Sequence, residues 1–489
     1  MDFKLSDANI LRVKCSVLVL GRFEEEGIIG FAKKVDSSLG GALSRLSQDE
    51  KFNGELGKSV LVNTLDKIGA ERVLLVGFGK RAGFSSDNLR KAGIVTAKKV
   101  KPFSGGVAFS FGIDSKRGDF SALMEGLTLG NYEFDKYKTN NKKGNGIKTI
   151  EFISSKVGEK SFKEELEFAK AIAEAINFAR DLINEPPVVM TPTRLAGIAE
   201  AIAEEQKLHC EIFDREEMAK RGMGALLAVS LGSEEPPKFI HLTYEPRKKP
   251  RRTVAIVGKG ITFDTGGLCI KPRDSMRTMK MDMSGAACVL GVMKAITKFN
   301  PPVRVHGLIS ATENMPGGKA YKPDDIVRAL NGKTIEVIDT DAEGRIVLSD
   351  ALSYAVQLKV DEIVDLATLT GACIVALGNY TAGLMGNNEK LIDKIIKAAK
   401  LAGEKVWQLP MDEELRKDIE SDVADVKNVG SRWGGAITAA MFLEKFVGDT
   451  PWAHLDIAGP AFIERGGDWY PKGSTGFGVR TIIRYLLEK

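Results

Sequence analysis

The sequence predicts an α/β protein with an N-terminal α/β domain over residues 1–160 and a larger α/β domain over residues 161–489, whose central sheet is mostly parallel. Three observations favour this fold class. The length of 489 residues suits more than one domain. Strand-like and helix-like segments alternate along the first third of the chain. Further on, continuous apolar runs alternate with segments of helical spacing, which is typical of parallel strands buried on both faces.

In the N-terminal part, the apolar runs at residues 17–20 and 73–76 are expected to form strands, and residues 87–99 have helical spacing. The polar stretch YKTNNKKGNGIK, residues 137–148, carries turn signals and predicts a loop near the end of the first domain. A long helix is expected over residues 164–183, ended by Pro186 and Pro187. A second helix is expected to begin near Thr193, where TPT supplies a capping hydroxyl and a proline.

From residue 253 onward the pattern becomes more regular. We expect strands at 253–257, 303–310, 334–338 and 362–366, and helices at 285–297, 323–330 and 347–358. Ligands of such sheets bind beyond the carboxyl ends of the strands. Polar residues that follow these strands are therefore the first candidates for a functional site.

Composition and charge narrow the class of protein. The net charge is +5, from 70 Lys and Arg against 65 Asp and Glu, which gives no reason to expect a nucleic-acid or membrane partner. The five cysteines are scattered and form no CxxC pair, as expected for a reducing compartment. Neither a signal-peptide pattern nor an apolar run of about 18 residues is present, so a cytoplasmic location is expected.

Several familiar motifs are incomplete. GFGKRA, residues 77–82, matches a dinucleotide-binding fingerprint, but no acidic residue follows about twenty residues later, and we do not expect a nucleotide cofactor there. Gly332-Lys333-Thr334 ends like a P-loop, but Val327 occupies the position of the first glycine. With four histidines and no HExxH, a zinc site built from histidines is not expected, and His454 is interpreted as structural.

Acidic residues gather where the strands of the second domain are expected to end. Lys259 and Asp264 follow the run 253–257, Asp282 precedes the helix at 285–297, and DTDAEGR brings Asp341 and Glu343 after the run 334–338. Each acid alone has an ordinary explanation as a helix cap, a glycine turn or a solvated loop. Together they predict four carboxylates at one edge of the sheet, which is the pattern of a site for two cations.

Charge supports this prediction. Two divalent cations would balance four carboxylates, and such a pair of metals needs bridging carboxylates. Lys259 would then be either a neutral amine that binds a metal or the cationic partner of the acids. Both possibilities remain open at this point.

The motifs GKGITFDTGGLCIKP, MKMDMSGAA, DTDAEGR and ATLTGA resemble those of the leucyl (cytosol) aminopeptidases, a family of two-metal exopeptidases. The resemblance continues through ENMPGGKAYKPDDI, GGAITAAMFLEKF, WAHLDIAGPA and TGFGVRT, and upstream through NEPPVVMTPT. It implies a macro-domain-like N-terminal domain, two Mn²⁺ or Zn²⁺ ions per subunit, peptide substrates with a free N-terminus, a preference for leucine, and a homohexamer.

The resemblance also implies roles for individual residues. The metal ligands would be Lys259, Asp264, Asp282, Asp341 and Glu343, with Asp264 and Glu343 shared by both ions. Lys271 and Arg345 would form the catalytic pair, with bicarbonate held by the arginine as general base. The substrate would lie against Met279, Thr368, Leu369, Gly371 and Ala458.

One residue departs from the family pattern. The family has Asn where this chain has Asp339, and the additional charge is expected to alter the pH optimum while metal binding stays intact.

A two-metal phosphoesterase would also use clustered acids, although an amine ligand argues against it. A regulator that binds nucleic acid through the N-terminal domain is disfavoured by the near-neutral charge.

Overall fold

The computed structural model describes residues 2–103, 105–110, 118–139, 147–153, 160–467, 469–470 and 472–488. These residues form two compact units. The N-terminal unit comprises Met1–Glu174 with Gly466–Pro471. The second unit comprises Ala175–Arg465 with Lys472–Lys489; because it holds the segments expected to be catalytic, it is called the catalytic unit below. The division falls within helix α5 (Lys160–Asn184), whereas the sequence predicts a domain boundary at residue 160. Most of the loop predicted at 137–148 lies outside the described residues.

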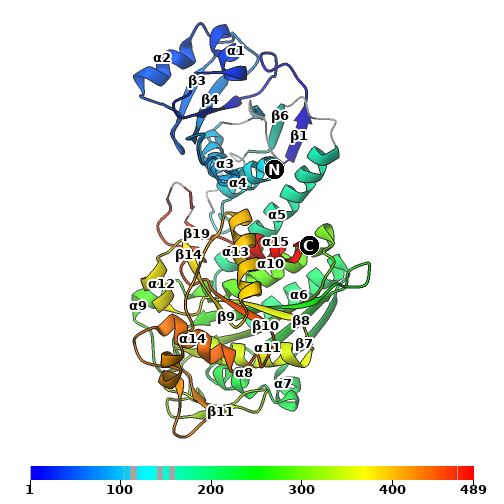
Figure 1. Cartoon of the computed structure of the whole chain (residues 1–489), viewed down its shortest axis with the longest axis vertical. Coiled ribbons are helices and arrows are strands. Elements are labelled where there is room, and N and C mark those ends of the chain that lie inside the picture. The colour runs from blue at the N-terminus through cyan, green and yellow to red at the C-terminus, as the bar shows by residue number, and fades with distance from the viewer. Residues whose placement is uncertain are drawn as a thin grey trace. The chain divides into compact units, whose positions relative to one another are not determined.

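The N-terminal unit is built on a six-stranded sheet with the order β1-β6-β5-β2-β4-β3, in which only β3 runs antiparallel to its neighbour. Helices α3 and α4 pack on one face and α1 and α2 on the other, so that apolar side chains of the strands are buried on both sides (Figure 1). The predicted strands at 17–20 and 73–76 and the helix at 87–99 are confirmed as β2, β4 and α3. The elements are β1 Asp2–Ser6, β2 Val17–Phe23, α1 Gly30–Ser38, α2 Ala42–Asp49, β3 Ser59–Asn63, β4 Arg72–Gly79, α3 Ser86–Val100, β5 Val107–Ser110, α4 Asp119–Asn131 and β6 Thr149–Ile153.

The catalytic unit is built on an eight-stranded sheet with the order β15-β14-β17-β13-β9-β10-β8-β7. Its four central strands, β17, β13, β9 and β10, run parallel. Its strands are β7 His209–Phe213, β8 Lys238–Tyr244, β9 Thr253–Asp264, β10 Arg304–Asn314, β13 Glu362–Ala367, β14 Thr381–Gly386, β15 Lys405–Gln408 and β17 Trp452–Asp456. The predicted α/β class with a mostly parallel central sheet is confirmed.

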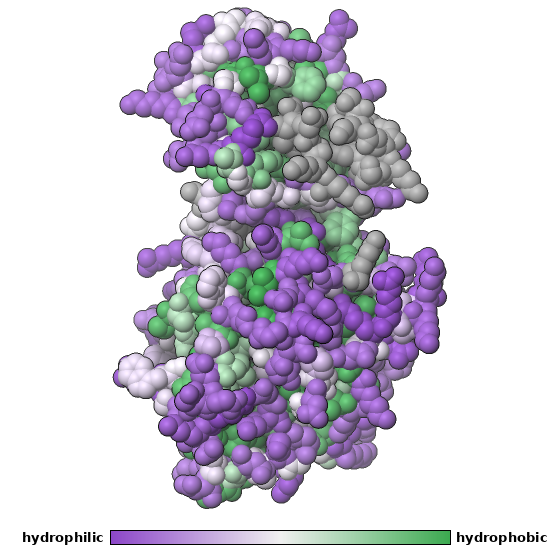
Figure 2. Space-filling view, in the orientation of Figure 1, coloured by the Kyte–Doolittle hydropathy of each residue, from purple (hydrophilic) through white to green (hydrophobic). Residues whose placement is uncertain are grey.

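Helices cover both faces of this sheet: α6, α10, α13 and α15 on one and α8, α11 and α14 on the other (Figure 1). On the face of the catalytic unit seen in Figure 2, hydrophilic side chains dominate, and the apolar strands lie inside. Helix α6 begins as predicted, because the Thr191 hydroxyl accepts a hydrogen bond from the Arg194 amide and Pro192 follows. The helices are α6 Pro192–Gln206, α7 Arg215–Arg221, α8 Gly224–Val229, α9 Arg273–Met276, α10 Ser284–Phe299, α11 Glu343–Gln357, α12 Gly371–Leu377, α13 Glu389–Ala402, α14 Gly435–Glu444 and α15 Val479–Leu486, with the 3-10 turns η1 Ser230–Gly232, η2 Met279–Met283 and η3 Glu413–Ile419.

Two predictions for the region before α11 are wrong. The helix predicted at 323–330 is instead the strand β11 (Ile326–Arg328), because Asp324 adopts a positive φ of 71° that a helix cannot contain. The strand predicted at 334–338 is β12 (Thr334–Glu336), but it belongs to a small sheet with the order β11-β12-β16, where β16 is Val426–Lys427. The remaining pair, β18 (Phe462–Ile463) and β19 (Gly473–Ser474), is antiparallel.

Among the residues that the structure describes, no helix is both long and apolar enough to span a membrane.

Candidate active site

The five predicted metal ligands come from four parts of the catalytic unit. Lys259 lies within β9 and Asp264 is the last residue of that strand, Asp282 belongs to η2, Asp341 lies in the loop after β12, and Glu343 begins α11. Four of them are buried and Asp341 is half-buried. The sequence suggested that all four acids lie at the edge of one sheet, after its strands, but the acids do not all follow strands of that sheet. The loop after β12 returns to the carboxyl end of β9 and brings Asp341 and Glu343 with it.

The structure brings these side chains together. Carboxylate oxygens of Asp264, Asp341 and Glu343 lie within 4.8 Å of one another. The Lys259 Nζ atom lies 2.9 Å from Asp282 Oδ2 and 2.8 Å from Glu343 Oε1. The Lys271 Nζ atom lies 2.8 Å from Asp264 Oδ2 and forms a second ion pair with Asp341. Six of the predicted functional residues therefore form one cluster.

The electrostatics of the cluster reflect crowded negative charge away from water. Burial, together with Asp264, raises the pKa of Glu343 to about 8, and burial raises the pKa of Asp341 to about 6. Burial by itself would lower the pKa of Lys259, but Asp282, Glu343 and Asp264 outweigh burial and raise that pKa above its ordinary value. Two ammonium groups leave two of the four negative charges of Asp264, Asp282, Asp341 and Glu343 unbalanced.

The donor set fits divalent cations. The oxygens Asp282 Oδ2, Asp341 Oδ1 and Glu343 Oε1 each pair with a lysine ammonium group and have no other hydrogen-bond partner among the described residues. Carboxylate oxygens converging on one point, with net negative charge, are the ligands that Mn²⁺, Mg²⁺ and Zn²⁺ accept. The cluster therefore has ligand atoms and unbalanced negative charge that suit a divalent cation.

Two glycines allow these elements to approach closely. A Cβ atom on Gly285, at the start of α10, would lie 2.0 Å from the Leu366 carbonyl oxygen of β13 and 2.8 Å from the Lys259 amide nitrogen of β9, so only glycine lets this helix start pack so closely on the two strands. A Cβ atom on Gly344 would lie 2.6 Å from Lys259 Nζ. The glycine of DAEGR thus provides the space in which the lysine amine lies between Glu343 and Asp282.

Asn314, at the end of β10, holds Asp264 in place and was not predicted. Its Nδ2 donates to Asp264 Oδ1 at 2.8 Å and to the Thr340 carbonyl oxygen at 2.9 Å. The Thr340 hydroxyl in turn donates to the Gly266 carbonyl oxygen at 2.6 Å. Asn314 thereby ties the loop after β12 to the end of β9. Its position at the end of a central strand beside β9 was a signal that could have identified it.

Arg345 lies beside the cluster and is buried. Its Nη1 donates to the Asn428 carbonyl oxygen at 2.8 Å, and its Nε has no hydrogen-bond partner among the described residues. Burial lowers its pKa to about 10. Asn428 was also not predicted from the sequence. It holds the loop after β12 through hydrogen bonds to the backbone of Ile338 and Asp339. The Asp339 side chain accepts the Asp341 amide at 2.8 Å, a contact that Asn could also make.

The predicted substrate residues lie mostly around the turn after β13. The Thr368 hydroxyl donates to Asp282 Oδ1 at 2.7 Å. The Leu369 and Ala458 amides both donate to Asp456 Oδ1, at 3.2 and 3.1 Å. Asp456 therefore positions two of the predicted residues, although the sequence gave it no role. Gly371 follows as the exposed first residue of α12, and Met279 lies half-buried in η2, the turn that carries Asp282.

His454 is fully buried in β17 and lies 2.6 Å from Asp365, which also accepts the indole N–H of Trp452. These contacts agree with the structural role that the sequence suggested for this histidine.

Comparisons with known proteins match this arrangement. The model for the catalytic domain of the cytosol aminopeptidase family matches residues 177–483, and the model for its N-terminal domain matches residues 19–141. A probable cytosol aminopeptidase of Persephonella marina is 46% identical over 501 residues and covers 100% of both chains. One of Aquifex aeolicus is 48% identical and covers 95% of this chain and 94% of its own.

Solved structures agree. A mutant of tomato leucine aminopeptidase superposes with a TM-score of 0.92 at 35% identity, covering 100% of this chain and 97% of its own. The bottromycin maturation enzyme BotP in complex with Mn superposes with a TM-score of 0.85 at 34% identity, covering 96% of this chain and 99% of its own. These comparisons support neither the phosphoesterase nor the nucleic-acid-binding regulator. The chain belongs to the cytosol aminopeptidase family and is a metal-dependent aminopeptidase.

Proposed function

We propose that Lys259, Asp264, Asp282, Asp341 and Glu343 hold two divalent ions, Mn²⁺ or Zn²⁺, and that the enzyme releases N-terminal residues, leucine preferred, from peptides. The observation that carries this proposal is the buried convergence of Asp264, Asp341 and Glu343 within 4.8 Å. When bound, the ions supply Lewis acidity and lower the pKa of a water molecule to near neutrality. Asp264 and Glu343 would be shared by both ions, while Lys259 and Asp282 serve one and Asp341 the other.

Lys259 has to lose a proton to act as a ligand. Its ammonium group now balances Asp282 and Glu343, and entering cations would take over that balance and favour the neutral amine. The two possibilities that the sequence left open, ion pair and metal ligand, are then two states of the same side chain.

Lys271 is proposed to act on the scissile carbonyl. Its ammonium group pairs with Asp264 and Asp341, and it becomes available when cations engage those carboxylates. A positive charge aimed at the developing oxyanion stabilises the transition state. We expect Lys271→Met to lower kcat by roughly 10²–10³-fold while metal content by elemental analysis is unchanged. Lys294→Met, which removes an exposed pair between Lys294 of α10 and Glu205 of α6, should keep wild-type kcat.

Arg345 is proposed to hold bicarbonate, which would accept the proton of the attacking water. The guanidinium is planar and suits two hydrogen bonds to one carbonate edge, and its buried Nε has no partner among the described residues. Activity of the wild-type enzyme should rise when bicarbonate is added to decarbonated buffer. Arg345→Lys should lose that response, and an equal response in both would contradict this role.

Substrate selection is proposed to depend on the free α-amine and on the first side chain. The amine would bind one of the ions, which limits cleavage to the peptide N-terminus. Met279, Thr368 and Ala458 would form the pocket for the first side chain, and the backbone of Leu369 and Gly371 would line the cleft. Substitution of Ala458 by Phe should raise KM for leucine substrates more than for alanine substrates.

The deciding experiment combines metal analysis with activity. Protein purified without added ions should contain Mn²⁺ or Zn²⁺, and it should hydrolyse leucine p-nitroanilide faster when Mn²⁺ or Zn²⁺ is added. Chelation should abolish turnover. A protein that cleaves p-nitrophenyl phosphate but not leucine p-nitroanilide would refute the assignment of these residues to a peptidase site.

We also propose a cytoplasmic homohexamer. The relatives carry the name cytosol aminopeptidase. Several large apolar side chains of the catalytic unit are exposed, which supports their burial in an assembly: Val375 89%, Trp433 68%, Trp407 65% and Val423 63%. Analytical ultracentrifugation should give six times the chain mass of 53.1 kDa, and a monomer at micromolar concentration would contradict the assembly.

A further inference from the structure

A row of buried polar groups leads along β17 to the turn that follows β13, residues 368–371. Strands β13 and β17 pair in parallel, with Asp365 opposite His454 and Ala367 opposite Asp456. Asp365, His454 and Asp456 are each 0% exposed. Alternate residues of one strand and opposite residues of neighbouring strands share a face of the sheet, so these three side chains lie on the same face. The mechanism proposed above uses neither Asp365 nor His454.

Asp456 holds the turn after β13 in place. Its Oδ1 accepts the amides of Leu369 and Ala458, at 3.2 and 3.1 Å, and its Oδ2 accepts the Thr370 hydroxyl at 2.7 Å. Among the described residues Asp456 accepts these three hydrogen bonds and donates none, which is the pattern of a carboxylate, because a protonated acid would need an acceptor for its own proton. A negative charge is therefore buried at this end of the row.

The turn that Asp456 holds contacts two of the proposed metal ligands through Thr368. The Thr368 carbonyl oxygen accepts a hydrogen bond from Lys259 Nζ at 3.1 Å, and the Thr368 hydroxyl donates to Asp282 Oδ1 at 2.7 Å. When Lys259 loses a proton to bind a metal, its lone pair takes the place of an N–H that now faces Asp282 or Glu343, while the bond to Thr368 stays. The position of the turn thus sets the direction in which the amine meets a metal.

His454 supplies the positive charge of the row. Its Nδ1 lies 2.6 Å from Asp365 Oδ1, and within the described residues neither Asp365 nor Asp456 forms an ion pair with a lysine or an arginine. Burial by itself would lower the pKa of His454, but Asp365 and Asp456 together outweigh burial and raise that pKa above its ordinary value. The other ring nitrogen, Nε2, has no hydrogen-bond partner in the described part of the chain, so Asp365 alone fixes the ring by a hydrogen bond.

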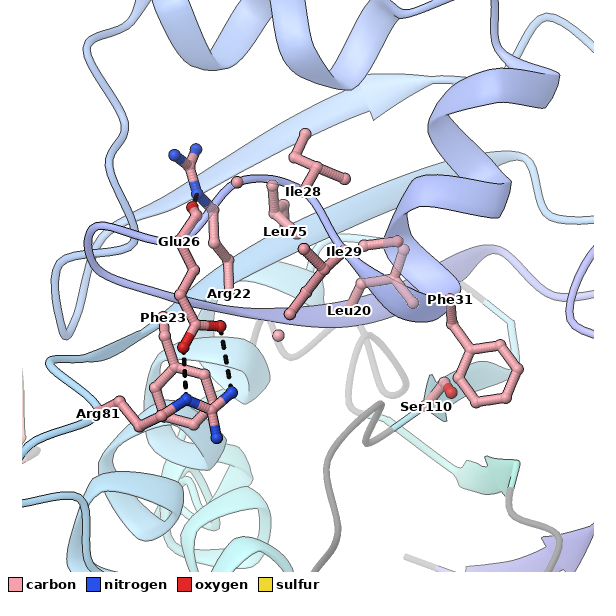
Figure 3. Close-up of a pocket in the computed structure, with 13 residues that line it drawn as sticks. Leu20, Arg22, Phe23, Glu26, Ile28, Ile29, Phe31, Leu75, Arg81 and Ser110 are labelled. Atoms are coloured by element: carbon pink, nitrogen blue, oxygen red, sulfur yellow. Dashed lines mark hydrogen bonds and ion pairs between the residues drawn. The ribbon is translucent and has the colours of Figure 1, made fainter.

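Charges in this row act strongly on one another, because water does not screen them. The ion pair of Glu26 and Arg81 in the N-terminal unit provides the contrast: Figure 3 shows two contacts between these side chains, but they are 26% and 59% exposed. Exposed pairs of this kind contribute little to stability. A buried charge that loses its partner is strongly unfavourable instead. Loss of the His454 charge would therefore leave the carboxylates of Asp365 and Asp456 without a balancing cation.

We propose that His454 and Asp365 are positioning residues of the aminopeptidase reaction: the positive charge of His454, fixed by Asp365, balances Asp456, which holds the turn that orients Lys259 and Asp282. Neither His454 nor Asp365 forms a hydrogen bond or ion pair with a proposed metal ligand among the described residues, so both act through Asp456. The inference rests on the proposed function, in which Lys259 and Asp282 bind a metal.

The Mn²⁺ dependence of leucine p-nitroanilide hydrolysis tests the proposal in His454→Gln and in the double variant His454→Gln with Asp365→Asn. His454→Gln removes the charge and keeps an amide that can donate to Asp365. The Mn²⁺ concentration for half-maximal activity should rise by about 10–100-fold, as for other groups that orient metal ligands, whereas kcat at saturating Mn²⁺ should change far less.

The double variant distinguishes charge balance from packing. Asp365→Asn removes one of the two carboxylates that His454→Gln leaves unbalanced, so the double variant should need less Mn²⁺ than His454→Gln. If His454 only filled space, the double variant would be at least as impaired as His454→Gln. Where His454→Gln by itself does not fold, folding of the double variant would support the same charge balance.

Glu125→Gln is the matched control. The Glu125 side chain is 0% exposed and lies 2.9 Å from Arg90 Nη2 in the N-terminal unit, so this variant also removes one charge of a buried ion pair. Its melting temperature should fall, while its Mn²⁺ dependence should equal that of the wild type.

The proposal is overturned if folded His454→Gln needs no more Mn²⁺ than Glu125→Gln, or if the double variant needs more Mn²⁺ than His454→Gln or does not fold. Lys259→Met separates this failure from failure of the proposed function. If Lys259→Met binds Mn²⁺ as tightly as the wild type, the proposed role of Lys259 as a ligand is wrong, whatever the His454 variants show.

Discussion

Replacing Asn314 by Leu tests whether the hydrogen bonds around Asp264 control metal affinity. The substitution keeps the side-chain volume and removes two donors, one to Asp264 Oδ1 and one to the Thr340 carbonyl oxygen. Both acceptors keep one partner each, the Gly266 amide and the Tyr321 hydroxyl, each at 2.8 Å. The fold should therefore survive at a cost of about 2–4 kcal/mol, from one bond to a charged group and one neutral bond.

The larger effect is expected on the metals. Losing a partner that orients a metal ligand typically costs 10–100-fold in affinity. Bound metal stabilises the folded protein, and a 100-fold loss of metal affinity lowers this stabilisation by about 2.7 kcal/mol at a fixed metal concentration. Urea unfolding with and without Mn²⁺ measures that difference, and the Mn²⁺ dependence of leucine p-nitroanilide hydrolysis gives the affinity. At saturating Mn²⁺, kcat should recover most of its wild-type value.

Asn387→Leu provides the control for Asn314→Leu. Asn387 also bonds two backbone groups, the Thr450 carbonyl oxygen and the Trp452 amide, and it lies outside the metal cluster. The Asn387→Leu variant should be less stable than the wild type but should bind Mn²⁺ with the same affinity. The reasoning fails if Asn314→Leu binds Mn²⁺ as tightly as the wild type, or if both variants weaken Mn²⁺ binding equally.

Three further predictions concern packing, acid stability and pH. Gly344→Ala places a methyl group 2.6 Å from Lys259 Nζ, so metal content should fall, whereas Gly318→Ala, with open space around the new Cβ, should retain it; elemental analysis compares the two. Burial lowers the pKa of both His241 and His306 to about 4, so the unfolded chain binds protons that the folded chain does not, and stability present above pH 6.5 should be lost as the pH falls toward 4. The free energy of unfolding should fall by about 2 kcal/mol per imidazole between pH 7 and 5, and urea unfolding at the two pH values measures this. A free energy of unfolding that does not change with pH would contradict the prediction. Glu211, 3.3 Å from His241, favours the protonated imidazole, but its side chain is 41% exposed and water screens its charge. Asp339 contributes to the raised pKa of Asp341, so Asp339→Asn should move the acid limb of the pH–rate profile to lower pH, and an unchanged profile would count against this effect.

The sequence by itself determined the class of fold and most of the chemistry of the site. Apolar runs between helical segments predicted the central strands β9, β10 and β13, because burial on both faces requires continuous apolar sequence. The TPT motif predicted the start of α6, since its capping bond joins residues three apart. The clustered acids, with the motifs around them, indicated a two-metal aminopeptidase before their geometry was known.

Only the tertiary structure decided how the site is assembled. Local spacing assigned residues 323–330 to a helix and placed Asp341 and Glu343 after a strand of the main sheet, whereas β11 and β12 form a small sheet of their own. The contacts that return Asp341 and Glu343 to β9 join residues far apart in the chain, such as Asn314 with Asp264 and Asn428 with Asp339. Such bonds leave no periodic pattern in the sequence, because their partners are neighbours only after the sheet has formed. The sheet of the N-terminal unit shows the same limit, since parallel pairing of β2 with β5 joins segments that the sequence separates by two strands and three helices.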